Sequence, residues 1–151
     1  MPEILLPGKG TVKKIRKENE AMVEEKDYYM RVVHELVRTL IRLVFRKEID
    51  KDEEKTVPLE VLEQYKKLTA MIDDGQINEA ENLLLDGMEV DSRAYFELTL
   101  LFYEKLNAKT DEFLEEHDYS REEVLDGIKY VVDFYGYGSL MDAFVDENAL
   151  K

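Results

Sequence analysis

The stretch RAYFELTLLFYEKL, residues 93–106, carries large apolar side chains on almost every side when it is wound as an α-helix. A helix that is apolar all round cannot face water, so it belongs in the middle of a bundle of other helices. Asp91 or Ser92, just before it, is a suitable residue to cap the start of the helix. The stretch therefore predicts an all-α fold with one central, buried helix.

The segments around this stretch show the same helical periodicity and end at recognisable start and stop residues. Periodic apolar positions predict helices at residues 27–47, 59–74, 79–86, 111–118, 122–135 and 139–150. The expected start residues are Thr56 with Pro58, Asn78, Thr110, and Ser120, which forms a capping box with Glu123; Gly75 and Gly87 are expected to end helices. No stretch alternates apolar and polar residues as a strand would. We therefore expect a compact bundle of about six or seven helices, joined by short loops.

Length and composition limit the number of domains. The chain has 151 residues, of which 44% are hydrophobic and 37% charged, so one folded domain is expected. Residues 1–24 contain two prolines and two glycines near their start and few large apolar residues. They are predicted to form an N-terminal arm or an extension of the next helix, and residues 25–151 a single all-α domain.

The sequence also indicates the compartment. The chain has no cysteine, which is compatible with a reducing interior. The first ten residues, MPEILLPGKG, lack the basic segment and apolar stretch of a secretory signal, and no apolar run is long enough to cross a bilayer. We expect a cytoplasmic protein that has no membrane partner.

The charge of the chain is divided unevenly along its length. The formal net charge is −14, of which residues 1–47 contribute +4 and residues 48–151 contribute −18. On the predicted helix at residues 27–47, Arg31, Arg38, Arg42 and Arg46 fall on one face. Arginine can form paired hydrogen bonds to carboxylates, so the row is expected to meet acidic helices of the same chain, of a second copy or of another protein.

Motifs for catalysis and for metal or cofactor binding are missing. His34 and His117 do not have acidic neighbours at metal-ligand spacing, and PGKGT at residues 7–11 lacks the Ser or Thr that should follow Gly-Lys in a phosphate loop. The acidic loop at residues 50–54 lacks the glycine of a calcium loop. We therefore expect no catalytic residues, no metal and no cofactor, and a protein that is not an enzyme.

Two resemblances add to this interpretation. The segment from Leu68 to Tyr103 resembles a tetratricopeptide-type helical hairpin, in which Gly75 and Ala80 take the places of the small residues that let two helices pack closely. The run that begins DYYMRVVHELVRTL at Asp27 and ends in DFYGYGSL resembles a family of small, functionally uncharacterised helical proteins from Gram-positive bacteria. That resemblance implies no activity.

The function itself is not encoded in any motif, and the sequence favours a non-catalytic helical module for protein–protein interaction. Its partner would be another protein or a second copy of the chain in a homo-oligomer. The predicted surface is a groove between the helix at residues 27–47 and the hairpin at residues 59–87. The candidate contact residues are Tyr28 and Tyr29 as aromatic anchors and Arg31, Arg38 and Arg42 as partners of acidic groups.

The alternative is a protein that binds nucleic acid or an anionic surface through its basic N-terminal segment, which includes KKIRK at residues 13–17. The negative charge of the remaining chain opposes this alternative, because it repels a polyanion from most directions.

Overall fold

The computed structural model describes residues 26–45 and 58–149, with side chains described as far as residue 143. These residues form seven helices and no strand, which confirms the predicted all-α bundle. The first helix covers residues 26–45. The others are α2 (Leu59–Asp73), α3 (Ile77–Asp86), α4 (Arg93–Asn107), α5 (Asp111–Glu116), α6 (Arg121–Phe134) and α7 (Gly138–Ala149). The predicted arm at residues 1–24, Arg46 and Thr56 lie outside the described residues.

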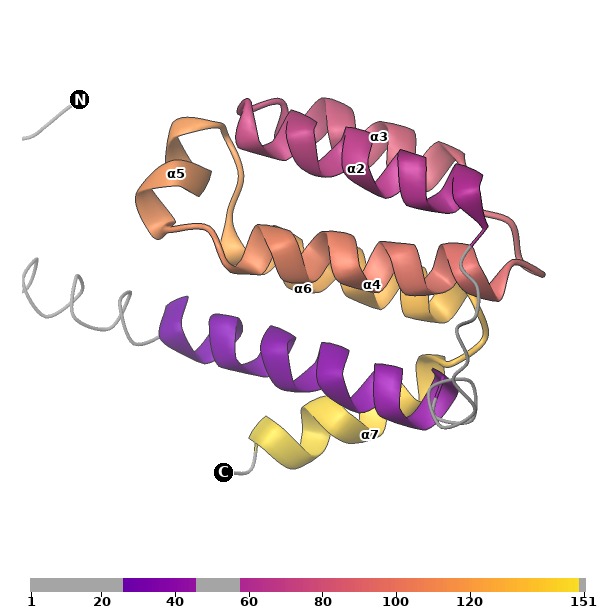
Figure 1. The fold of residues 1–151 in the computed structure, drawn as a ribbon. Helices are drawn as coiled ribbons and strands as arrows, with labels where there is room; N and C mark the ends of the chain where they lie inside the picture. The colour runs from indigo at the N-terminus through magenta and orange to yellow at the C-terminus, as the bar shows by residue number, and fades with distance from the viewer. Residues whose placement is uncertain (1–25, 46–57, 150–151) are drawn as a thin grey trace, which may run out of the picture.

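The helices are arranged in three layers around α4 (Figure 1). The hairpin of α2 and α3 lies on one side of α4, and the first helix lies on the other side together with α7. Helix α6 packs beside α4 in the middle layer, and α5 closes one end of the bundle. This arrangement places α4 between the first helix and the hairpin. The prediction of a groove between the first helix and the hairpin is therefore wrong.

Helix α4 is the centre of the core, as its sequence predicted. Its buried residues point in nearly every direction around the helix: Phe96, Leu98, Thr99, Leu100, Phe102, Tyr103, Leu106 and Asn107. Tyr103 is packed so tightly that a Cβ atom on Gly127 of α6 would lie 2.5 Å from its ring. A glycine in the interior of a helix costs stability, but here it lets α6 approach α4 closely.

Three of the predicted helix caps are present in the structure, and one is not. The hydroxyls of Ser92 and Thr110 accept backbone hydrogen bonds at the starts of α4 and α5, and Ser120 with Glu123 forms the predicted capping box of α6. Asn78 was wrongly predicted as a cap, since α3 begins at Ile77. The chain turns at Gly75, whose φ of +89° belongs to the left-handed region, and α3 therefore starts earlier than the cap residue suggested.

The first helix buries one face, although Met30 and Leu43 of its predicted apolar stripe are exposed. Val32, Val33, Leu36, Val37 and Leu40 are all buried in the core. The polar stripe predicted on the other side, which includes Arg31, Glu35 and Arg38, is exposed. None of the described helices combines the length and the apolar character that crossing a bilayer requires.

Candidate functional site

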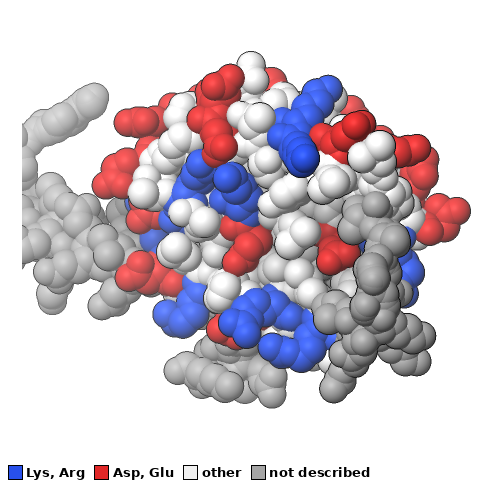
Figure 2. All heavy atoms as spheres, viewed as in Figure 1, with Lys and Arg blue, Asp and Glu red and all other residues white. Residues whose placement is uncertain are grey.

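The exposed face of the first helix carries the arginine row, defined as Arg31, Arg38 and Arg42. All three side chains are exposed. Figure 2 shows Lys and Arg along the lower edge of the molecule, where the first helix lies, and further Lys and Arg among the Asp and Glu of the upper part of the same face. The structure therefore places the three predicted residues on one accessible surface.

The arginine row has no carboxylate partner within the part of the chain that the structure describes. The ion pairs of residues 26–45 and 58–149 involve other cations, and none includes a guanidinium of the row. Arg31 lies beside an aromatic ring instead, since its Cζ is 5.9 Å from the ring centre of Tyr28. The sequence left three kinds of acidic partner open. Acidic helices within the described part of the same chain do not pair with the row.

The two predicted aromatic anchors hold the first helix to the bundle. Tyr28 and Tyr29 are half-buried, and their rings meet edge to face with centres 5.8 Å apart. The hydroxyl of Tyr29 donates a hydrogen bond of 3.1 Å to Glu122 Oε2 on α6. Both rings also pack against the core. Their position beside Arg31 leaves only part of each ring open to a partner.

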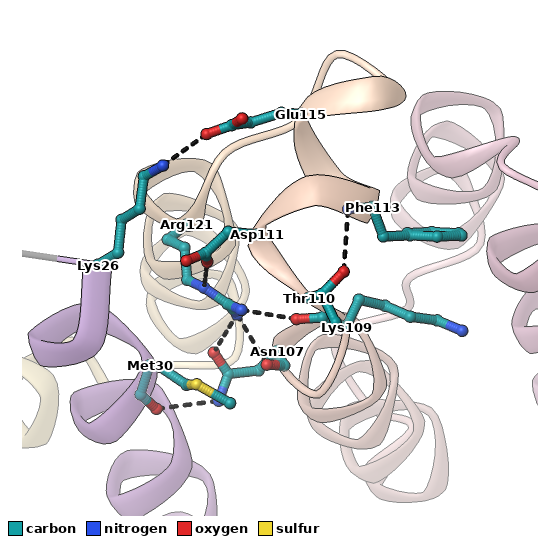
Figure 3. A network of polar contacts seen from close by, with 9 residues as sticks. All are labelled: Lys26, Met30, Asn107, Lys109, Thr110, Asp111, Phe113, Glu115 and Arg121. Carbon is teal, nitrogen blue, oxygen red and sulfur yellow. Dashed lines mark hydrogen bonds and ion pairs between the residues drawn. The ribbon is translucent and has the colours of Figure 1, made fainter. Parts of the chain in front are cut away.

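A polar network fixes the start of the first helix to the ends of α4 and α5 (Figure 3). The Arg121 guanidinium, whose side chain is 6% exposed, donates from Nε to Asp111 Oδ1 at 2.8 Å, from Nη1 to the Asn107 carbonyl at 2.7 Å and from Nη2 to the Lys109 carbonyl at 2.6 Å. Asn107 Nδ2 in turn donates to the Met30 carbonyl at 2.9 Å. One buried cation therefore fixes the backbone at the end of α4 and in the α4–α5 loop, and Asn107 at the end of α4 holds the first helix.

A second tie joins the same end of the first helix to α5. Lys26 Nζ donates a hydrogen bond to Glu115 Oε2, and this bond raises the pKa of Lys26 above its ordinary value. Both side chains are partly exposed, so the pair contributes little to stability. It helps to orient the helix that carries the row.

A hollow of about 600 Å³ opens beside Arg31, between the first helix and α4. Its lining includes Asp27, Met30, Arg31, His34, Glu104 and Ala108. His34 Nδ1 lies 2.7 Å from Glu104 Oε2, so His34 joins the first helix to α4. Glu104 Oε1 is shielded from solvent and has no hydrogen-bond partner within the described structure. Of the two oxygens of this lining carboxylate, one is therefore paired with His34 and the other is closed off from solvent.

A further carboxylate lies inside the bundle, away from the arginine row. Glu81 Oε2 of α3 accepts hydrogen bonds from the hydroxyls of Tyr103, at 2.6 Å, and Tyr119, at 3.0 Å. Burial raises the pKa of Glu81, although the two phenol donors oppose that effect. Burial also raises the pKa of both tyrosines, so their hydroxyls stay protonated and act as donors.

The raised pKa of Glu81 predicts how its contribution to stability changes with pH. The folded state binds this proton more tightly than the unfolded chain, so the contribution is fully present below the ordinary pKa of 4.5 and is lost as the pH rises through the raised folded value. Glu81→Gln removes the titration. In urea unfolding between about pH 4 and about pH 8, the unfolding free energy of the variant should gain on that of the native chain as the pH rises. A difference that stays constant or falls with pH would show that Glu81 is not destabilised by burial.

No group of three or more His, Cys, Asp or Glu side chains within residues 26–45 and 58–149 is arranged to hold a metal ion. The acid–histidine pair of the hollow and the Glu81 pair with its tyrosines were not predicted from the sequence. Their members are far apart along the chain, since His34 and Glu104 are 70 residues apart. Only the packing of the helices brings them together.

The chain was compared with known proteins. No curated protein and no solved structure matches it. The comparison with protein families matches residues 23–136, from just before the first helix to the turn after α6, to a family of unknown function, DUF6483. The match spans the arginine row, the central helix and the hairpin of α2 and α3, and covers well over half of the 151 residues. The chain therefore belongs to the DUF6483 family.

Proposed function

We propose that this protein is a non-catalytic, cytoplasmic interaction module that binds an acidic helix of another protein through the arginine row. One observation carries the proposal. Three exposed guanidiniums share one helix face and lack a carboxylate partner in the described structure, although the chain contains 35 acidic residues. An exposed row of like charges repels itself, so an acidic partner relieves that repulsion when it binds.

The spacing of the row defines the partner. Arg38 and Arg42 are four residues apart and Arg31 and Arg38 seven, which corresponds to rises of about 6 Å and about 10 Å along the helix. A partner helix that lies along the row would meet it with acidic residues at the same two spacings. Arginine suits this role because its planar fork binds a carboxylate through two parallel hydrogen bonds.

A second copy of the chain is a poorer partner for this face. In a symmetric dimer with its axis near Arg38, each copy would place its own row opposite the row of the other. Like charges directly opposite each other cost free energy. The row therefore favours a partner that brings acidic residues of its own.

A nucleic acid is disfavoured for a related reason. The net charge of −14 repels a polyanion at long range, whereas a short acidic helix meets mainly the local field of the row. The tetratricopeptide-like pattern of the α2–α3 hairpin is part of this proposal, because it also suits a helical module that acts by binding.

The proposal can be tested with a designed peptide. The probe is a fluorescent, helix-forming peptide of about 18 residues that carries Glu at spacings of four and seven. Binding is measured by fluorescence anisotropy at about 50 mM and about 300 mM salt, and a labelled DNA duplex and a single-stranded RNA are measured in parallel. We expect the peptide to bind, binding to weaken with salt, and Arg38→Glu with Arg42→Glu to reduce the affinity about tenfold or more.

The matched control is Lys66→Glu with Lys67→Glu on α2. Both lysines are exposed, and their reversal changes the net charge by the same amount while it leaves the row intact. The control should lose much less affinity than the arginine variant. Equal losses in the two variants, or tighter binding of DNA or RNA than of the peptide, would overturn the proposal.

A further inference from the structure

The exposed face of α6 supports an inference that does not depend on the arginine row. Lys129, Tyr130, Asp133 and Phe134 all lie on this face, while the opposite side of the helix is buried in the core. We propose that this face is the contact surface of a homodimer, in which α6 of one copy lies antiparallel against α6 of a second copy.

The first argument is the apolar character of this face. Tyr130 is 58% exposed and Phe134 is 38% exposed, and they are four residues apart, so they form one aromatic row along the helix. Aromatic side chains contribute much of the binding energy of protein interfaces, because each buries a large area when it is covered. The aromatic row therefore gains free energy when a second surface excludes water from it.

The second argument is the shape of the surface beside the aromatic row. A hollow of about 630 Å³ opens where α6 meets the start of α7. Lys129, Tyr130 and Asp133 of α6 line it together with Gly136 and Gly138. A Cβ atom on Gly136 would meet nothing within 4 Å. The surface next to α6 is therefore low, and a second helix can approach the exposed face without a steric block.

The third argument selects a second copy as the partner. Lys129 and Asp133 are also four residues apart, and they form a row of opposite charges next to the aromatic row. Neither forms an ion pair with another residue in the part of the chain that the structure describes. When two such helices lie antiparallel about a two-fold axis at the level of residue 131, Lys129 of each copy lies opposite Asp133 of the other. The face is thus complementary to itself in charge.

The same axis also pairs the aromatic rows and separates the acids. Tyr130 of each copy comes within about 3 Å, measured along the helix, of Phe134 of the other. Asp126, which is exposed nearer the start of α6, is about 15 Å along the axis from Asp126 of the second copy, whereas physiological salt screens charges over about 8 Å. The acids of the two helices therefore repel each other only weakly across the interface.

The first test measures the mass of the full chain in solution. Sedimentation velocity at about 150 mM salt, from about 1 µM to about 300 µM protein, detects association with a Kd in the micromolar range. We expect a monomer–dimer equilibrium that Tyr130→Ser weakens about tenfold or more. Leu59→Ser removes a similarly exposed apolar side chain from α2 and should leave the equilibrium unchanged. A native chain that stays monomeric at the highest concentration, or equal weakening by the two variants, overturns the proposal.

Charge reversals test the antiparallel register. Lys129→Asp alone and Asp133→Lys alone each place like charges opposite each other, so each variant by itself should dimerise about tenfold or more weakly than the native chain. A mixture of the two variants brings opposite charges together at both contacts and should recover the native affinity. Both variants keep a strongly negative net charge, so long-range attraction does not explain such a recovery.

The matched control is the pair Lys67→Asp and Glu63→Lys on α2. These two positions are exposed and four residues apart, as Lys129 and Asp133 are, and each control variant alone should dimerise like the native chain. Circular dichroism shows that every variant keeps its helices. If the α6 reversals left the dimer unchanged, or if their mixture did not associate more tightly than either variant alone, the antiparallel pairing of α6 would be wrong.

Discussion

Replacing Arg121 by methionine is expected to lower the free energy of unfolding by about 3 kcal/mol or more. The side chain is 6% exposed, and its guanidinium satisfies the Asp111 carboxylate and the backbone carbonyls of Asn107 and Lys109. Methionine keeps much of the apolar stem but supplies no donor, so three acceptors near the α4–α5 loop lose their partner. Urea unfolding followed by circular dichroism measures the change.

The effect should spread from the loop to the first helix, because Asn107 also holds the Met30 carbonyl. Hydrogen exchange should therefore become faster in α5 and in the first turns of the first helix before it does so in α3. Lys129→Met is the matched control: it removes the same charge from an exposed position of the same helix and should cost less than about 0.5 kcal/mol. If the two variants lost similar amounts of stability, Arg121 would not be the residue that organises this end of the bundle.

Gly127→Ala is expected to destabilise the chain by about 1–3 kcal/mol, although alanine is the better residue for a helix. The new Cβ would lie 2.5 Å from atoms of the Tyr103 ring. That ring is fully buried, and its hydroxyl is bonded to Glu81, so it cannot move aside without breaking the bond. The helices α4 and α6 must separate instead, which loosens the centre of the core.

A double-mutant cycle with Tyr103→Leu separates this clash from other effects. Leucine vacates the space that the alanine methyl group enters, so Gly127→Ala should cost less in the Tyr103→Leu background than in the native one, by about 1 kcal/mol or more. Thermal or urea unfolding of the four proteins gives the coupling free energy. A coupling of zero would mean that the close approach of α6 to α4 does not depend on the missing side chain.

The parts of the structure that could be predicted from the sequence depend on neighbouring residues. The capping box of Ser120 and Glu123 spans three positions, and the all-round apolar character of residues 93–106 is visible in one stretch. Both predictions were confirmed. The start of α3 was missed because the left-handed turn at Gly75 overrides the preference of Asn78 for a cap position.

The parts that could not be predicted depend on how the helices are ordered in space. The sequence placed the first helix against the hairpin, whereas α4 lies between them (Figure 1). Periodicity shows which face of a helix is buried but not which neighbour covers it. For the same reason, the sequence predicted that Arg31, Arg38 and Arg42 share one face of the first helix, but it did not predict the pairing of His34 with Glu104 across 70 residues.

The most direct measurement of the proposed function is a charge-swap experiment on the arginine row. The variant Arg38→Glu with Arg42→Glu is titrated with the acidic peptide and with a second peptide in which the two matching Glu residues are replaced by Arg. The account predicts that the swapped peptide recovers binding to the variant and loses binding to the native chain, so that the coupling between the two changes is at least about 1 kcal/mol. A swapped peptide that binds the variant no better than the acidic peptide does would contradict the assignment of the row as the docking surface.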